Sequence, residues 1–203
     1  SGTVYLWQGN PEFWSGQAPV LFPIVGCLRN GTATIGDNKT CSFGRHGLAR
    51  RLEFDLVSSS DTSITYSLKA NDKTKEQYPY DFELQMTYEL TEHGVKVSHT
   101  VINHDSVVMP YCVGGHPAFN CPVFENESFE DYIVEFEQPE NAACAQLTED
   151  GLINNADRVS VLENEAVIPV RHSLFYKDAL VFDALKSRKV ALKHKKTGHG
   201  ILV

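Results

Sequence analysis

Alternation of apolar and polar residues with a period of two is the feature that most constrains how this chain folds. Between residues 82 and 90 every second side chain is apolar, and residues 95–101 repeat the pattern after a polar break. Successive side chains of a strand point to opposite faces, so this spacing predicts half-buried strands. The break at residues 91–94 predicts a hairpin with a four-residue loop.

The same pattern predicts two further hairpins. One pairs residues 52–56 with residues 64–68, and the other pairs residues 190–192 with residues 201–203. No stretch of a dozen or more residues holds a helical period, so we expect helices to be few and short. Strands at short spacing with turns between them predict an all-β sandwich or barrel. No repeat or linker interrupts residues 1–203, which predicts a single domain.

Composition argues against several classes of partner. The formal net charge is −8, which disfavours nucleic acid and anionic membranes as main partners. No apolar run reaches the length of a membrane span, and the first residues do not resemble a signal peptide. Five cysteines at irregular spacing favour reduced thiols in a cytoplasm. None has zinc-like spacing to a histidine pair, so we do not expect a structural metal site.

A histidine lies between a pair of glycines and a proline in the segment Gly114-Gly115-His116-Pro117. Paired glycines allow a tight turn or a close approach of the backbone to a ligand. Pro117 restricts its own φ and favours an extended His116. A rigidly held imidazole suits proton transfer near neutral pH. The alternative is a turn whose histidine caps a neighbouring carbonyl group.

A second histidine lies in the segment Gly44-Arg45-His46-Gly47-Leu48-Ala49-Arg50. The guanidinium of Arg50 can donate to a hydroxyl, carboxylate or phosphate group. A polar loop with solvated arginines is the alternative reading. Upstream, two prolines interrupt the apolar residues 18–26, which predicts a buried loop or edge element that lines the core, and secondarily a pocket.

Four blocks in this order resemble the aldose 1-epimerase family, and most closely its galactose mutarotase-related branch of the LacX type. They are Tyr5-Leu6-Trp7-Gln8-Gly9, Leu21-Phe22-Pro23-Ile24-Val25-Gly26, His46-Gly47-Leu48-Ala49-Arg50 and Gly114-Gly115-His116-Pro117-Ala118-Phe119. The resemblance runs from Tyr5 to the last residue. It implies a large antiparallel β-sandwich, the galactose mutarotase-like supersandwich. It also implies an isomerase that interconverts the α and β anomers of aldohexoses without a metal or cofactor.

The resemblance further implies roles for individual residues. In this reaction a base takes the proton of the anomeric hydroxyl while an acid protonates the ring oxygen. The resemblance assigns the role of the acid to His116. It assigns to His46 the role of a neutral imidazole that orients the ring oxygen, since two adjacent imidazoles resist both being charged. Arg50 matches an arginine that contacts sugar hydroxyls or phosphate, and Asp178 matches an aspartate that binds sugar hydroxyls. Phe119 or Tyr111 could stack on the apolar face of the sugar ring, and the alternative for each is a place in the core.

Two departures from the family pattern remain. Cys27 stands where the branch usually has arginine, and Arg29 is the candidate substitute. The general-base glutamate of the family belongs to a C-terminal block, and Glu163 and Glu165, in a loop-like segment, match nothing catalytic. We therefore expect a sandwich truncated at both ends, with the base outside this chain. Three alternatives stay open: a non-catalytic carbohydrate-binding module, a hexose-6-phosphate 1-epimerase and, more weakly, a structural β-sandwich.

Overall fold

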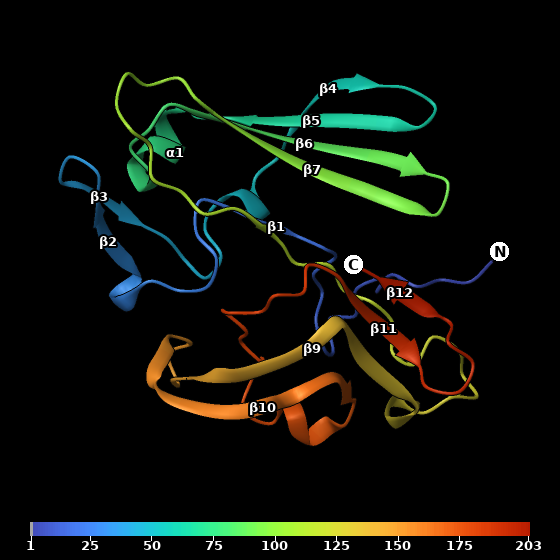
Figure 1. The fold of residues 1–203 in the computed structure, drawn as a ribbon. Coiled ribbons are helices and arrows are strands. Elements are labelled where there is room, and N and C mark those ends of the chain that lie inside the picture. The colour runs from blue at the N-terminus through green and yellow to red at the C-terminus, as the bar shows by residue number, and fades with distance from the viewer. Residues whose placement is uncertain (1) are drawn as a thin grey trace. The chain divides into compact units, whose positions relative to one another are not determined.

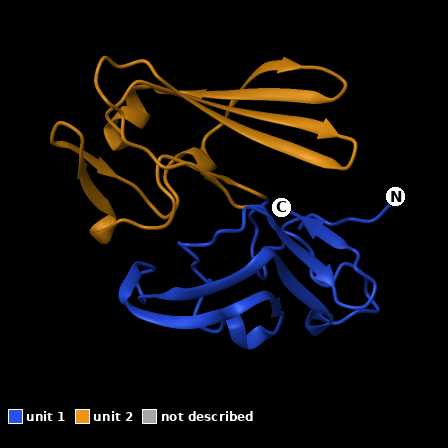
Figure 2. Ribbon diagram, viewed as in Figure 1, with its two compact units in different colours: residues 1–17, 117–203 blue, residues 18–116 orange. Residues whose placement is uncertain are grey.

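The computed structural model describes residues 2–203 and consists mainly of antiparallel strands. Strands make up 46% of the structure and helices 9%, as the period-two pattern predicts. Two compact units divide the chain: residues 18–116 form one, and residues 1–17 with 117–203 form the other (Figure 2). The single domain expected over residues 1–203 stays a prediction.

A four-stranded antiparallel sheet dominates the unit of residues 18–116 (Figure 1). Its order is β4-β5-β6-β7, with β4 Asp55–Ser59, β5 Ser63–Lys69, β6 Phe82–Thr91 and β7 Gly94–Asn103. Both hairpins predicted in this region are therefore confirmed. The four-residue loop is wrong, because Thr91 pairs with Gly94 and only two residues separate the paired ends.

One end of this sheet supplies much of the core of its unit. Leu68 pairs with Leu84, and Leu84 pairs with Val101, so their side chains share one face across three strands. Leu84 and Phe82 are completely buried and pack with Phe22 of the proline-containing segment. The prediction that residues 18–26 contribute to the core is therefore confirmed.

Shorter elements complete this unit. The strands are β1 Val20–Leu21, β2 Thr32–Ile35, β3 Lys39–Ser42 and β8 Gly114–Gly115; the helices are α1 Asp72–Gln77 and the 3₁₀ turns Arg29–Gly31 and Ala49–Arg51. Two-stranded antiparallel sheets pair β1 with β8 and β2 with β3. A capping box between Asn71 and Thr74 satisfies the first backbone N–H groups of α1.

The other unit carries a four-stranded antiparallel sheet of order β10-β9-β11-β12 (Figure 1). Its strands are β9 Tyr132–Leu147, β10 Ile153–Pro169, β11 Val190–His194 and β12 Gly200–Leu202, with 3₁₀ turns at Phe129–Asp131 and His172–Phe175. The third predicted hairpin corresponds to β11 and β12. The loop expected around Glu163 and Glu165 is wrong, because both residues lie in β10, where register shifts interrupt the pairing.

The helices of this chain are short. The longest, α1, has six residues. Within residues 2–203 the structure contains no helix long and apolar enough to cross a membrane.

Candidate functional site

His46 lies in a loop that its own backbone hydrogen bonds hold closely against the segment of Phe22. The backbone N–H groups of Leu48 and Ala49 both donate to the carbonyl oxygen of Phe22, at 3.0 and 3.2 Å. Gly47 has a φ of +78°, and a Cβ there would lie 2.2 Å from the same oxygen. Only glycine fits this position, and this steric restriction explains why a glycine follows His46.

Two hydrogen bonds join His46 itself to Gly26. The backbone N–H of His46 donates to the carbonyl oxygen of Gly26 at 2.7 Å, and the backbone N–H of Gly26 donates to His46 Nδ1 at 3.0 Å. His46 has a φ of +69°, which is uncommon for a residue with a side chain. These contacts orient the imidazole as well as the backbone.

His116 follows β8, which pairs with β1. Val20 pairs with Gly115 and Leu21 with Gly114, and the N–H of His116 donates to the carbonyl oxygen of Pro19 at 3.1 Å. A Cβ at Gly114 would lie 3.2 Å from a methyl carbon of Val25. The glycine pair therefore lies in paired extended backbone and not in a tight turn, and its approach to a ligand stays a prediction.

The fold brings the two predicted histidines together. The imidazole centroids of His46 and His116 lie 5.6 Å apart, with the rings at 73° to each other. Burial lowers the pKa of His46, and the nearby charges of His116, Arg50 and Arg45 lower it further. His46 is half-buried and His116 is exposed. This arrangement favours a neutral imidazole at His46 beside a second imidazole open to a ligand.

Arg50 joins this pair to an adjacent hollow of about 430 Å³. The hollow is mostly apolar and aromatic, and its lining consists of Ala18, Pro19, Val20, Ala49, Arg50, Leu52, Phe54, Tyr66, Met86 and Tyr88. Arg50 is half-buried, whereas Arg51, its neighbour in the same 3₁₀ turn, is exposed. The turn, rather than strand alternation, separates the two guanidinium groups. The secondary expectation that residues 18–26 line a pocket is confirmed for the first three of them.

The remaining predicted site residues lie in other parts of the chain. Arg29 is exposed in a 3₁₀ turn, so Cys27 and Arg29 do not belong to one regular extended segment. Asp178 belongs to the other unit, is exposed and has a φ of +75°; its carboxylate accepts a hydrogen bond from the N–H of Ala179 at 2.7 Å. Their roles toward a sugar stay predictions. Tyr111 is partly exposed, and its ring lies 6.0 Å from that of Phe22.

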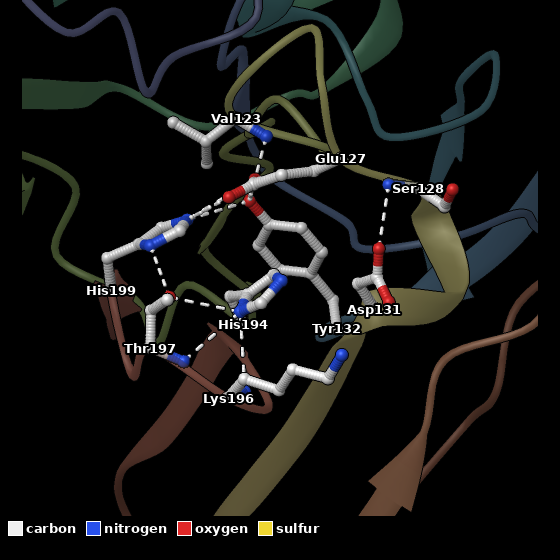
Figure 3. A network of polar contacts seen from close by, with 9 residues as sticks. All are labelled: Val123, Glu127, Ser128, Asp131, Tyr132, His194, Lys196, Thr197 and His199. Atoms are coloured by element: carbon white, nitrogen blue, oxygen red, sulfur yellow. Dashed lines mark hydrogen bonds and ion pairs between the residues drawn. The ribbon is translucent and has the colours of Figure 1, made fainter.

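The unit of β9–β12 contains a polar cluster that the sequence did not predict (Figure 3). Glu127, His194 and His199 place one ligand atom each within 4.8 Å of one another. Imidazole and carboxylate groups are the kinds that bind Zn²⁺ in proteins. Their positions in sequence, 127, 194 and 199, gave little signal, because only the pairing of β11 with β9 and β12 brings them together.

Internal hydrogen bonds already occupy this cluster. His194 Nδ1 accepts from the backbone N–H groups of Lys196 and Thr197 at 3.3 and 3.2 Å. His199 Nε2 lies 3.1 Å from Glu127 Oε1, and the hydroxyl group of the buried Tyr132 donates to the same carboxylate. With Nδ1 as an acceptor, the neutral His194 ring carries its proton on Nε2, which opposes metal binding there. The cluster is therefore best described as a polar network that ties the β11–β12 turn to the loop before β9.

Antiparallel sheets of this arrangement, with two imidazoles beside a half-buried arginine, place the chain in the galactose mutarotase-like class of β-sandwich folds. The aldose 1-epimerase family model matches residues 2–203, and the chain belongs to that family. The family resemblance of the four sequence blocks is thereby confirmed.

Several known proteins are similar over most of this chain. Protein LacX of Lactococcus lactis subsp. lactis, in its plasmid and chromosomal forms, is 41% identical over 208 residues, which cover all of this chain and 70% of the relative. A galactose mutarotase related enzyme from Lactobacillus acidophilus superposes with a TM-score of 0.89 at 32% identity, over 98% of this chain and 65% of its own. A galactose mutarotase-like protein from Lactobacillus casei gives a TM-score of 0.87 at 30% identity, over 98% and 67%. The chain thus spans about two thirds of these relatives.

Proposed function

We propose that the whole protein is an aldose 1-epimerase that interconverts the α and β anomers of an aldohexose. The observation that carries this proposal is the pairing of His46 and His116 at 5.6 Å beside Arg50. Anomer exchange needs a base at the anomeric hydroxyl and an acid at the ring oxygen. The ring then opens, the aldehyde rotates, and the ring closes on its other face. Metal and cofactor have no part in the proposed reaction.

His116 is the proposed acid, and His46 the neutral group that orients the ring oxygen. Burial and the charge of His116 both oppose protonation of His46, which supports this division of roles. An exposed imidazole such as His116 exchanges protons with solvent between turnovers. The base is proposed to come from the part of the longer relatives that this chain does not cover.

A neutral, free aldohexose is the proposed substrate. Arg50 is the charged residue in the lining of the hollow, and three aromatic side chains accompany it. Aromatic faces suit the apolar face of a pyranose, whereas a phosphate group favours several cationic groups in one place. Asp178 and Arg29 are proposed further contacts to sugar hydroxyls. The free cysteines support a reducing cytoplasm as the proposed location.

Polarimetry on freshly dissolved α-D-glucose and α-D-galactose tests the proposal on the full-length protein. We expect faster mutarotation than in buffer, and a loss of about 10²- to 10⁴-fold of the enzymatic rate in His116→Ala. His93→Ala is the matched control, because His93 lies at the exposed tip of the β6–β7 hairpin. Equal rates for the wild type and His116→Ala would refute the assigned mechanism.

A carbohydrate-binding module without turnover is the second candidate. Cys27 favours it, since the family branch usually has a sugar-contacting arginine there. Sugar binding measured by calorimetry, together with a mutarotation rate equal to that of buffer, would select the module. A faster rate with glucose 6-phosphate than with glucose would instead select a hexose-6-phosphate 1-epimerase.

A further inference from the structure

We infer that Gly26 is a positioning residue whose backbone N–H holds the His46 ring in its Nε2–H tautomer. The contact at the centre of this inference is the 3.0 Å hydrogen bond from that N–H to His46 Nδ1. Its catalytic meaning rests on the proposed function, but the tautomer itself is a property of the protein without a ligand.

The direction of the hydrogen bond decides where the proton sits. A backbone N–H only donates, so Nδ1 must present its lone pair to Gly26. A neutral imidazole carries one ring proton, which then belongs to Nε2. A second hydrogen bond, from the His46 N–H to the Gly26 carbonyl oxygen at 2.7 Å, keeps the two residues in register. Both polar groups of the Gly26 backbone thus bind the same residue.

Backbone geometry explains why glycine stands at this position. Gly26 has a φ of +87°, in the left-handed region that side chains disfavour. A Cβ built there meets nothing within 4 Å, so space does not exclude other residues. The requirement is conformational: the loop must turn its N–H and its carbonyl group toward His46.

The surroundings of His46 reinforce this state. A second proton on the ring would sit on Nδ1 and face the N–H of Gly26, with loss of the hydrogen bond. It would also charge a half-buried ring close to His116, Arg50 and Arg45, all of which lower the pKa of His46. The ring therefore stays neutral, donates through Nε2 and carries no second proton to transfer.

A fixed Nε2–H donor suits one kind of substrate atom. The ring oxygen of a pyranose carries lone pairs and no proton, so it accepts from Nε2–H and offers nothing to a ring nitrogen in the opposite tautomer. Gly26 acts on this contact only through His46. His46 then orients the ring oxygen without any change in its own protonation during turnover. Of the two histidines, His116 is the one that transfers a proton to the ring oxygen.

Imidazole ¹⁵N NMR of the protein without sugar tests the tautomer directly. We expect His46 to show an unprotonated Nδ1 and a protonated Nε2 across neutral pH. A protonated Nδ1 in the neutral ring overturns the inference. The assignment comes from the ring signals that disappear in His46→Asn, a substitution that tolerates positive φ.

A single-atom change tests the role of Gly26. Ligation at Cys27 can join a synthetic peptide that ends at Gly26 to the remainder of the full-length protein, which begins at Cys27, with an ester in place of the amide N–H of Gly26. We expect about a tenfold fall in the ratio of the Nε2–H to the Nδ1–H tautomer, because an ester oxygen cannot donate. The control is an ester at Phe13, whose N–H donates to the carbonyl oxygen of Asn10. The all-amide chain made by the same ligation reports on refolding.

The outcomes separate this inference from the proposed function. An unchanged tautomer ratio in the folded Gly26 ester overturns the role of Gly26, whatever the rate of mutarotation. The expected tautomer in a protein that does not accelerate mutarotation would leave the inference intact and refute the enzyme. In an active protein, we expect the Gly26 ester to lower kcat more than it raises KM, since the contact to the ring oxygen matters most as charge develops there.

Discussion

The imidazole rings of His46 and His116 lie edge to face at 5.6 Å, although the two residues lie 70 positions apart in the sequence. Phe22 accepts hydrogen bonds from the loop of His46, and Pro19 accepts one from His116. Residues 18–26 therefore form hydrogen bonds with the segments of both histidines. Their proximity makes the protonation of one depend on the other, and the first prediction follows from this coupling.

The pKa of His46 should rise in His116→Ala. Burial is the largest cause of the lowered pKa and the charge of His116 the next, so the pKa should rise but stay below 6.5, the usual value of an imidazole. The folded state binds the second ring proton of His46 less tightly than the unfolded state does. The contribution of neutral His46 to the free energy of unfolding is therefore complete above pH 6.5 and is lost as the pH falls through the folded pKa. NMR titration of the His46 ring measures the change, with His93→Ala as the control. An unchanged titration would show that the two rings are not coupled.

Gly47→Ala should destabilise the protein by at least about 3 kcal/mol, since strain at positive φ adds to a backbone clash. The added Cβ would lie 2.2 Å from the Phe22 carbonyl oxygen, and φ is +78°. Gly44→Ala is the control, because a Cβ there meets nothing within 4 Å and no positive φ is involved. Urea unfolding compares the two variants, and equal losses would contradict the steric role of Gly47.

Glu83→Gln should lower the free energy of unfolding by roughly 1–3 kcal/mol at neutral pH. Hydrogen bonds from Gln85 and Ser67 lower the pKa of the buried Glu83 to about 2. Its stabilising effect is therefore complete above pH 4.5, the usual pKa of a glutamate, and is lost as the pH falls toward 2. The difference between wild type and variant in urea unfolding should shrink over that range.

Glu89→Gln gives the control for Glu83, because Glu89 forms an exposed ion pair with Lys96 on the same sheet. We expect a change below about 1 kcal/mol there. A pH-independent loss in Glu83→Gln would indicate that packing, and not the charge, is responsible.

Tyr132→Phe should cost roughly 1–3 kcal/mol, because it removes the donor to the Glu127 carboxylate and the acceptor for the Val123 N–H. Tyr132 is completely buried, so water does not readily replace its hydroxyl group. Tyr176→Phe is the control, since Tyr176 is 80% exposed. Thermal unfolding of both variants measures the difference, and equal melting temperatures would show that the polar network of Figure 3 is not stabilising.

Local patterns in the sequence determined three strand pairs of this protein, namely β4 with β5, β6 with β7 and β11 with β12. The alternation in residues 82–101 was sufficient to predict β6 and β7, because burying one face of a strand imposes a period of two. Glycine and proline also indicated the segments that carry His46 and His116, since these two residue types mark unusual backbone geometry. The family resemblance added the chemical roles that periodicity cannot supply.

Tertiary structure alone decided the contacts between distant segments. The hydrogen bond from Gly26 to His46 joins loops 20 residues apart, and the cluster of Glu127, His194 and His199 depends on how β11 pairs with β9 and β12. The turn of Ala49–Arg51 placed Arg50 in the lining of the hollow and left Arg51 exposed. The sequence determines local period and backbone freedom, whereas the tautomer of a histidine and the partner of a carboxylate depend on groups that only folding brings within hydrogen-bonding distance.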